Sequence, residues 1–121
     1  MTPEALWKRY AAIWSLATEE RGPELKHCLA EDATYCDPNQ TIEGLHALSD
    51  YMGEFQRAVP EGRFEIRSVL HHHNRSLACW TMLGADGQLI QTGTSFGQLT
   101  KDGRLRQITG FFDVPGRGNH A

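Results

Sequence analysis

Residues 86–103, DGQLIQTGTSFGQLTKDG, decide the fold because they place one long strand between two tight turns. The pair Asp86-Gly87 is a strong signal for a two-residue hairpin turn. Asp102-Gly103 repeats the signal at the other end, and Leu89 to Leu99 between them reads as a strand. Antiparallel neighbours are therefore expected on both sides of this strand.

The flanking sequence supplies those neighbours. Strands are predicted at 64–71 and 77–83, with a turn at 73–75, and a last strand at 105–112. Alternation in the first of them places Phe64, Ile66, Ser68 and Leu70 on one face. Gly93, Gly97 and Gly110 interrupt the later strands, where glycine usually marks a bulge, a bend or the close approach of a ligand. The second half of the chain thus predicts a four-stranded meander.

The first half reads mainly as helix. Thr2-Pro3-Glu4 is a helix start, because it offers a capping hydroxyl, a proline at the first position and then an acid. Gly22-Pro23 is expected to end that helix and to begin a second, short one. A short strand is expected at 34–36, and a third, amphipathic helix at 43–58. Helices first and antiparallel strands later predict an α+β domain.

Composition sets the remaining limits. The 121 residues carry 12 basic and 15 acidic side chains, for a formal net charge of −3, which argues against a nucleic-acid-binding module. We expect one domain over residues 1–114 and a flexible C-terminal tail at 115–121. No apolar run is long enough for a membrane span, and no signal peptide is expected. The three cysteines have unrelated spacings and fit buried free thiols, which predicts a cytoplasmic protein.

Several stretches carry a resemblance to a known family. They are Tyr10 and Trp14 in the first helix, DATYCDP at 32–38, Gly44 at the start of the third helix, and DGRLRQITGFF at 102–112. In this order they resemble the nuclear transport factor 2-like superfamily, in particular its SnoaL-like and ketosteroid-isomerase-like branch, over residues 3–113. The resemblance implies a cone-shaped, curved antiparallel sheet wrapped around three N-terminal helices, with an apolar pocket between them. It also implies a homodimer, which we expect to form through the outer face of the sheet.

The same resemblance implies a reaction. Asp37 matches the family's general base, and Tyr10 matches its pocket tyrosine. Ser95 stands where the ketosteroid-isomerase branch carries a protonated aspartate as a second oxyanion donor. We therefore expect a cofactor-independent isomerase or lyase, similar to a ketosteroid isomerase or a polyketide cyclase or dehydratase, acting on a small apolar carbonyl compound. Because no charged residue occurs at 87–100, a non-catalytic ligand-binding or dimerisation domain remains the alternative.

Asp37 is also a candidate base on physical grounds. A residue before proline is held in an extended conformation, so this carboxylate belongs to a strand end. Apolar neighbours such as Trp14, Tyr35 and Phe112 would disfavour the anion and make the carboxylate a stronger base near neutral pH. The alternative is an ordinary Asp-Pro-Asn turn, in which the side chain bonds nearby backbone.

The remaining candidates are expected around an apolar pocket. They are Trp14, Tyr35, Met52, Phe55, His71, Gly93, Ile108 and Phe112, and the large apolar side chains among them equally fit a plain core role. His71, His72 and His73 alternate faces and lack an acidic partner nearby, so we expect no metal site. His71 alone could take part in catalysis, or all three could be solvated turn residues.

Overall fold

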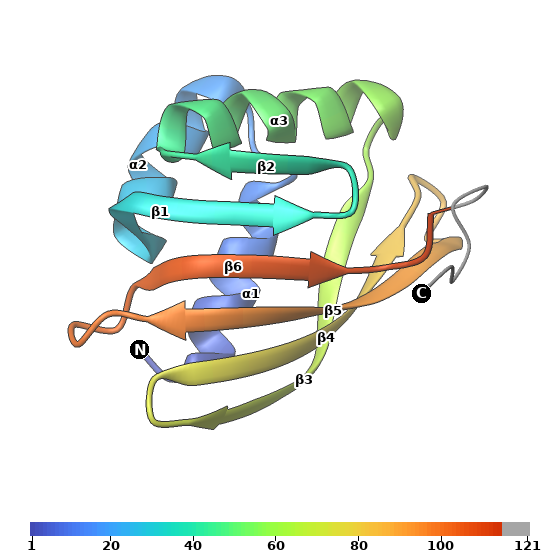
Figure 1. Ribbon diagram of the computed structural model, residues 1–121. Coiled ribbons are helices and arrows are strands. Elements are labelled where there is room, and N and C mark those ends of the chain that lie inside the picture. The colour runs from blue at the N-terminus through green and yellow to red at the C-terminus, as the bar shows by residue number, and fades with distance from the viewer. Residues whose placement is uncertain (115–121) are drawn as a thin grey trace.

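The computed structural model describes residues 1–114 and contains three helices and six strands (Figure 1). In chain order these are α1 (Pro3–Ile13), α2 (Thr18–Cys28), β1 (Leu29–Asp37), β2 (Gln40–Glu43), α3 (Leu45–Ala58), β3 (Arg63–His72), β4 (Arg75–Leu83), β5 (Leu89–Leu99) and β6 (Leu105–Phe111). The expected flexible tail at 115–121 lies outside the described residues.

All six strands form one sheet in the order β2-β1-β6-β5-β4-β3. The strands β3 to β6 pair antiparallel in sequence order, which confirms the predicted meander. The strand β1 then pairs parallel to β6, through partners such as Tyr35 and Ile108. This one parallel pairing joins the end of the chain to its first half, and it places the end of β1 beside the last strand of the meander.

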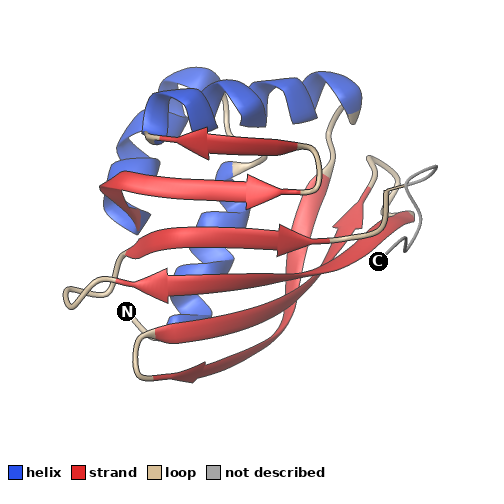
Figure 2. Ribbon diagram, in the orientation of Figure 1, coloured by secondary structure: helices blue, strands red, loops and turns tan. Residues whose placement is uncertain are grey.

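The sheet curves around the helices and remains open (Figure 2). The helix α1 crosses the concave face, and α2 and α3 pack together at the β2 end. Trp7, Ile13, Leu25, Leu105 and Ile108 are among the buried side chains that fill the space between the layers. The expected α+β architecture, a curved sheet wrapped around three helices, is confirmed. None of the helices within residues 1–114 has the length and apolar character needed to cross a membrane.

The helix boundaries differ from expectation at Pro23. Thr2 caps α1 as predicted, because its Oγ1 accepts from the N–H of Ala5 at 3.1 Å. However, the chain turns before Thr18, and Pro23 lies inside α2. A proline in this position removes one backbone hydrogen bond, whereas Leu25 and Cys28 are completely buried by the helix that contains it. Tertiary packing therefore outweighs the local signal for a break.

The first strand is longer than expected, and its hairpin partner was missed. The prediction of a strand at 34–36 was too short, because β1 begins at Leu29. Glu31 and Asp32 are both exposed, and the pairing with β6 shifts register before Thr34, so the alternation of side chains is interrupted there. The strand β2 has only four residues and buries only Ile42, which leaves too little pattern to identify it.

A bulge divides β3 into two parts. The register with β4 shifts between Ile66 and Ser68. Before the bulge, Phe64 and Ile66 face the interior, but after it Val69 packs on the core and Leu70 is 70% exposed. The predicted common face of Phe64 through Leu70 is therefore wrong beyond Ile66, because one extra residue exchanges the two faces of a strand.

Gly97 provides a test of packing between α1 and β5. A Cβ at this position would lie 2.6 Å from Cζ2 of Trp7 and 2.8 Å from Cδ2 of Leu105. We expect Gly97→Ala to lower the free energy of unfolding by about 1–3 kcal/mol, as measured by urea denaturation.

Gly22→Ala is the matched control, because a Cβ on this residue of α2 would have no neighbour within 4 Å. It should raise the free energy of unfolding by up to about 1 kcal/mol. A Gly97→Ala variant as stable as the parent protein would contradict this description of the core.

Candidate functional site

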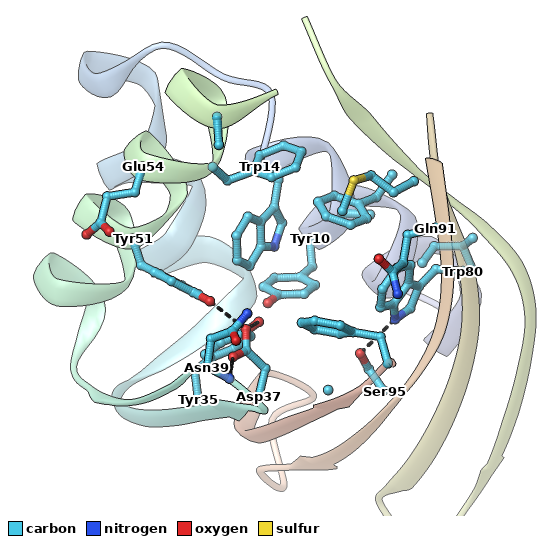
Figure 3. Close-up of a pocket in the computed structure, with 18 of the residues that line it drawn as sticks. Tyr10, Trp14, Tyr35, Asp37, Asn39, Tyr51, Glu54, Trp80, Gln91 and Ser95 are labelled. Atoms are coloured by element: carbon cyan, nitrogen blue, oxygen red, sulfur yellow. Dashed lines mark hydrogen bonds between the residues drawn. The ribbon is translucent and has the colours of Figure 1, made fainter. Parts of the chain in front are cut away.

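A cavity of about 460 Å³ lies between α1, α3 and the concave face of the sheet (Figure 3). Much of its wall is aromatic, with side chains from both helices, from the strands β1, β3 and β4, and from the residue that follows β6. The aromatic residues are Trp7, Tyr10, Trp14, Tyr35, Tyr51, Phe55, Phe64, Trp80 and Phe112. A mostly apolar pocket of this size with a few convergent polar groups is typical of a small-molecule site.

Asp37 is a buried polar group on the wall of the pocket. It is the last residue of β1 and is only 8% exposed. Its Oδ2 accepts hydrogen bonds from the hydroxyls of Tyr35 at 2.6 Å and Tyr51 at 2.8 Å. Its Oδ1 accepts from the backbone N–H groups of Asn39 at 2.8 Å and Gln40 at 3.1 Å. Oδ1 therefore closes the Asp-Pro-Asn turn, as expected if Asp37 were an ordinary turn residue. Oδ2 instead accepts hydrogen bonds from two phenols of the pocket wall.

The backbone fixes this carboxylate from both sides. Asp37 pairs with Gln40 of β2, and Cys36 pairs with Thr109 of β6. The next residue of β6 is Gly110, where a Cβ would lie 3.6 Å from Cβ of Asp37 and 3.6 Å from Oγ of Ser95. A side chain at Gly110 would therefore contact both Asp37 and Ser95, and the glycine keeps this part of the pocket wall free of one.

The two tyrosines remain protonated hydrogen-bond donors. Burial raises the pKa of Tyr35, and electrostatic interactions with the neighbouring Tyr10 and Asp37 raise it further. Burial also raises the pKa of Tyr51, and its hydrogen bond to Asp37 adds to the effect. Because both phenols keep their protons across the ordinary pH range, they can stabilise the anionic carboxylate inside an aromatic pocket.

Tyr51 was not among the predicted site residues. It lies on α3 three positions after Leu48 and four before Phe55, on the stripe that the apolar pattern defines. That spacing places the tyrosine at the edge of the inward face of the helix. The helical spacing therefore indicates that Tyr51 faces inward, but nothing in the sequence connects α3 with the end of β1.

Tyr10 lies on the helix side of the pocket. It is nearly fully buried, and in Figure 3 its hydroxyl points towards Asp37. Burial is the main cause that raises its pKa, the charge of Asp37 acts in the same direction, and a hydrogen bond with Trp14 opposes them. The phenol therefore stays protonated and can donate to an oxygen that develops negative charge in the pocket.

Ser95 lies on the sheet side of the pocket. Its Oγ accepts a hydrogen bond from the indole N–H of Trp80 at 3.0 Å, and the residue is 9% exposed. A hydroxyl that accepts one hydrogen bond still has its own proton to donate. Tyr10 and Ser95 therefore offer donors from the two layers that enclose the pocket.

The structure places half of the expected pocket residues on the wall. Trp14, Tyr35, Phe55 and Phe112 line the cavity, together with Tyr10, Asp37 and Ser95. The other four expected pocket residues, Met52, His71, Gly93 and Ile108, do not.

Each of these four has a physical reason for its position. Met52 and Ile108 are buried in the core behind the wall. A Cβ on Gly93 would lie 2.2 Å from Cζ2 of Trp80, so this glycine makes room for the indole and not for a ligand. His71 is exposed near the far end of β3, where its Nδ1 contacts the hydroxyl of Ser76. Among residues 1–114, no group of three or more His, Cys, Asp or Glu could hold a metal ion.

Comparison with solved structures found proteins of the same fold. A proposed isomerase of the SnoaL-like family from Agrobacterium tumefaciens str. C58 is 25% identical, with a TM-score of 0.84, 91% of this chain and 96% of that chain covered. A proposed SnoaL-like polyketide cyclase from Jannaschia sp. CCS1 is 12% identical, with a TM-score of 0.70 and coverages of 93% and 90%. A proposed ketosteroid isomerase from Kribbella flavida DSM 17836 is 20% identical, with a TM-score of 0.68 and coverages of 98% and 86%.

Sequence comparison gives one further result. No curated protein matches the chain. The model of the SnoaL-like domain family matches residues 7–108, which span most of the chain and include Tyr10, Asp37 and Ser95. The chain therefore belongs to the SnoaL-like domain family.

Proposed function

We propose that this protein is an isomerase or lyase that needs no cofactor and uses Asp37 as a general base on a small, mostly apolar carbonyl compound. The observation that carries the proposal is the position of Asp37, a buried carboxylate facing an aromatic pocket with Ser95 across the gap at Gly110. The names of its structural neighbours, which include isomerases and a polyketide cyclase, support the same class of reaction.

The proposed reaction starts with a proton transfer. Oδ2 of Asp37 takes a proton from the carbon beside the carbonyl group, and the electron pair of that C–H bond forms a C=C bond. The carbonyl oxygen becomes an enolate oxygen, which accepts hydrogen bonds from Tyr10 or Ser95. Return of the proton to another carbon gives an isomer, while departure of a leaving group gives an elimination product. The aromatic wall keeps water away from the enolate.

Under this proposal the hydrogen bonds of Asp37 have a second consequence. Oδ2 already accepts from Tyr35 and Tyr51, so both of its lone pairs are engaged. The substrate must therefore displace one hydroxyl. Tyr51 is the better candidate, because it is half-buried on α3 whereas Tyr35 is buried within β1.

Exchange of enolisable protons tests the proposed base. We expect the protein to accelerate hydrogen–deuterium exchange at the carbon beside the carbonyl of 2-tetralone in D₂O, followed by proton NMR. Asp37→Asn should reduce this rate by roughly 10²–10⁴-fold, because the amide keeps the shape of the side chain but cannot accept the proton. Binding of 2-tetralone should persist, and quenching of tryptophan fluorescence measures it, since all three tryptophans line the cavity.

Asp50→Asn is the matched control, because Asp50 is an exposed carboxylate on α3 that does not line the cavity. This variant should exchange 2-tetralone at the parental rate. Equal exchange by Asp37→Asn and the parent protein would refute the general-base proposal.

A second candidate function is a ligand-binding domain without catalysis. It is favoured by the absence of any charged residue at 87–100, which leaves Ser95 as an uncharged donor on β5. This candidate predicts that 2-tetralone quenches the tryptophans equally in the parent protein and in Asp37→Asn, with no acceleration of exchange in either.

We also propose that a second copy of the chain covers the outer face of the sheet. Leu70, Leu77 and Phe96 are direct cross-strand neighbours on β3, β4 and β5. Leu70 is 70% and Leu77 is 40% exposed, and Phe111 of β6 is exposed on an adjacent row. An apolar row of this kind across several strands is typical of an interaction surface.

Sedimentation velocity tests the proposed dimer. The parent protein should sediment as a dimer, and Leu77→Glu should shift it towards the monomer because a carboxylate would be buried without a partner. Ala12→Glu adds the same charge at an exposed position of α1 and should leave the dimer unchanged. A parent protein that sediments as a monomer would rule out the proposed dimer.

A further inference from the structure

We propose that the pocket selects ligands that carry a positive charge, and that the natural substrate is a carbonyl compound with a basic or quaternary nitrogen. The carbonyl part of this inference rests on the proposed function. The preference for a cation rests on the charges and rings around the cavity, and it can be measured without any reaction.

The charged residues that line the cavity within residues 1–114 are all acidic. Asp37, Glu54 and Asp113 line it, and the lining residues within the described part of the chain include no lysine, arginine or histidine. Two of these charges act on a residue of the pocket wall, because the negative charges of Asp37 and Glu54 both contribute to the raised pKa of Tyr51. An anionic ligand would meet this field without a counter-ion.

The two outer carboxylates are available to a ligand. Glu54 of α3 and Asp113 after β6 are exposed, and within residues 1–114 neither forms an ion pair. Arg63 and Arg67 of β3 both contact Glu65. Asp37 differs from the outer pair, because its four hydrogen bonds already offset its charge.

The apolar part of the wall also favours a cation. Trp14 has the rings of Tyr35, Tyr51, Phe55 and Phe64 around it, with centroid separations of 5.5–5.9 Å. A cluster of aromatic rings attracts an ammonium group through the negative faces of the rings. A neutral ligand would gain only the apolar contact. The rings and the carboxylates together therefore favour a cationic ligand over a neutral one.

These features predict one orientation for the substrate. In this orientation the nitrogen would lie near the outer carboxylates, the apolar body against the rings, and the carbonyl group between Asp37 and Ser95. A fixed positive charge on the substrate would also offset the negative charge of the enolate, for which the pocket offers only neutral donors. The proposed substrate class therefore supplies the cation that the protein does not.

Three ligands of one shape test the preference. They are trimethyl(3-phenylpropyl)ammonium, the neutral alcohol 2-methyl-5-phenylpentan-2-ol, and the anion 4-phenylbutanoate, with binding followed by tryptophan fluorescence. The ammonium compound should bind about tenfold more tightly than the alcohol, and the carboxylate should bind most weakly. The advantage of the ammonium compound should decrease with added salt.

The double variant Glu54→Gln/Asp113→Asn locates the effect. It should reduce the preference for ammonium over alcohol by at least threefold while the affinity for the alcohol stays unchanged. Glu31→Gln/Asp50→Asn is the matched control, because it removes two exposed carboxylates that do not line the cavity. This control should keep the parental preference.

The outcomes separate this inference from the proposed reaction. Carboxylate binding as tight as ammonium binding, no ammonium binding in the millimolar range, or an unchanged preference in Glu54→Gln/Asp113→Asn would each overturn the cation preference. Exchange of 2-tetralone that depends on Asp37 would survive such a result. Conversely, a clear preference for the ammonium ligand would stand even if no exchange were detected, and only the reaction would then be withdrawn.

Discussion

The hydrogen bonding of the Asp37 carboxylate is the interaction on which the site depends. Its Oδ1 closes the turn into β2, and its Oδ2 ties β1 to α3 through Tyr51. The parallel pairing of β1 with β6 then sets this carboxylate beside Gly110 and across from Ser95. A turn, a helix and the last strand of the meander therefore meet at one side chain.

This arrangement combines stability with reactivity at some cost to each. Burying a carboxylate among aromatic rings is unfavourable unless donors replace the lost water, and two phenols and two backbone N–H groups do so. The same donors engage the lone pairs that a base must offer. Tyr35 is fixed within β1, while Tyr51 comes from a separate helix, so the two hydroxyls differ in how easily a ligand can displace them.

The sequence was informative where structure is local. The Asp-Gly turns located the meander, and the family resemblance placed Tyr10, Asp37 and Ser95, which do line one pocket. The sequence misled where contacts between distant segments determine the local structure. The bulge after Ile66 reversed the faces of β3, and Pro23 lies inside a packed helix. Tyr51 was missed for the same reason, because its partner Asp37 ends β1, and a turn and the strand β2 separate it from α3.

The uncharged inner face of β5 follows from the same electrostatics. A Cβ on Gly110 would lie 3.6 Å from both Asp37 and Ser95, so an acid at position 95 would face a second carboxylate across a narrow, aromatic gap. Two such groups cannot both ionise without a large penalty, so an acid at position 95 would have to stay protonated in order to donate a hydrogen bond. Serine donates a hydrogen bond without adding a second ionisable group. Negative charge then remains only where four donors or open solvent offset it, namely at Asp37 and at the outer carboxylates of Glu54 and Asp113.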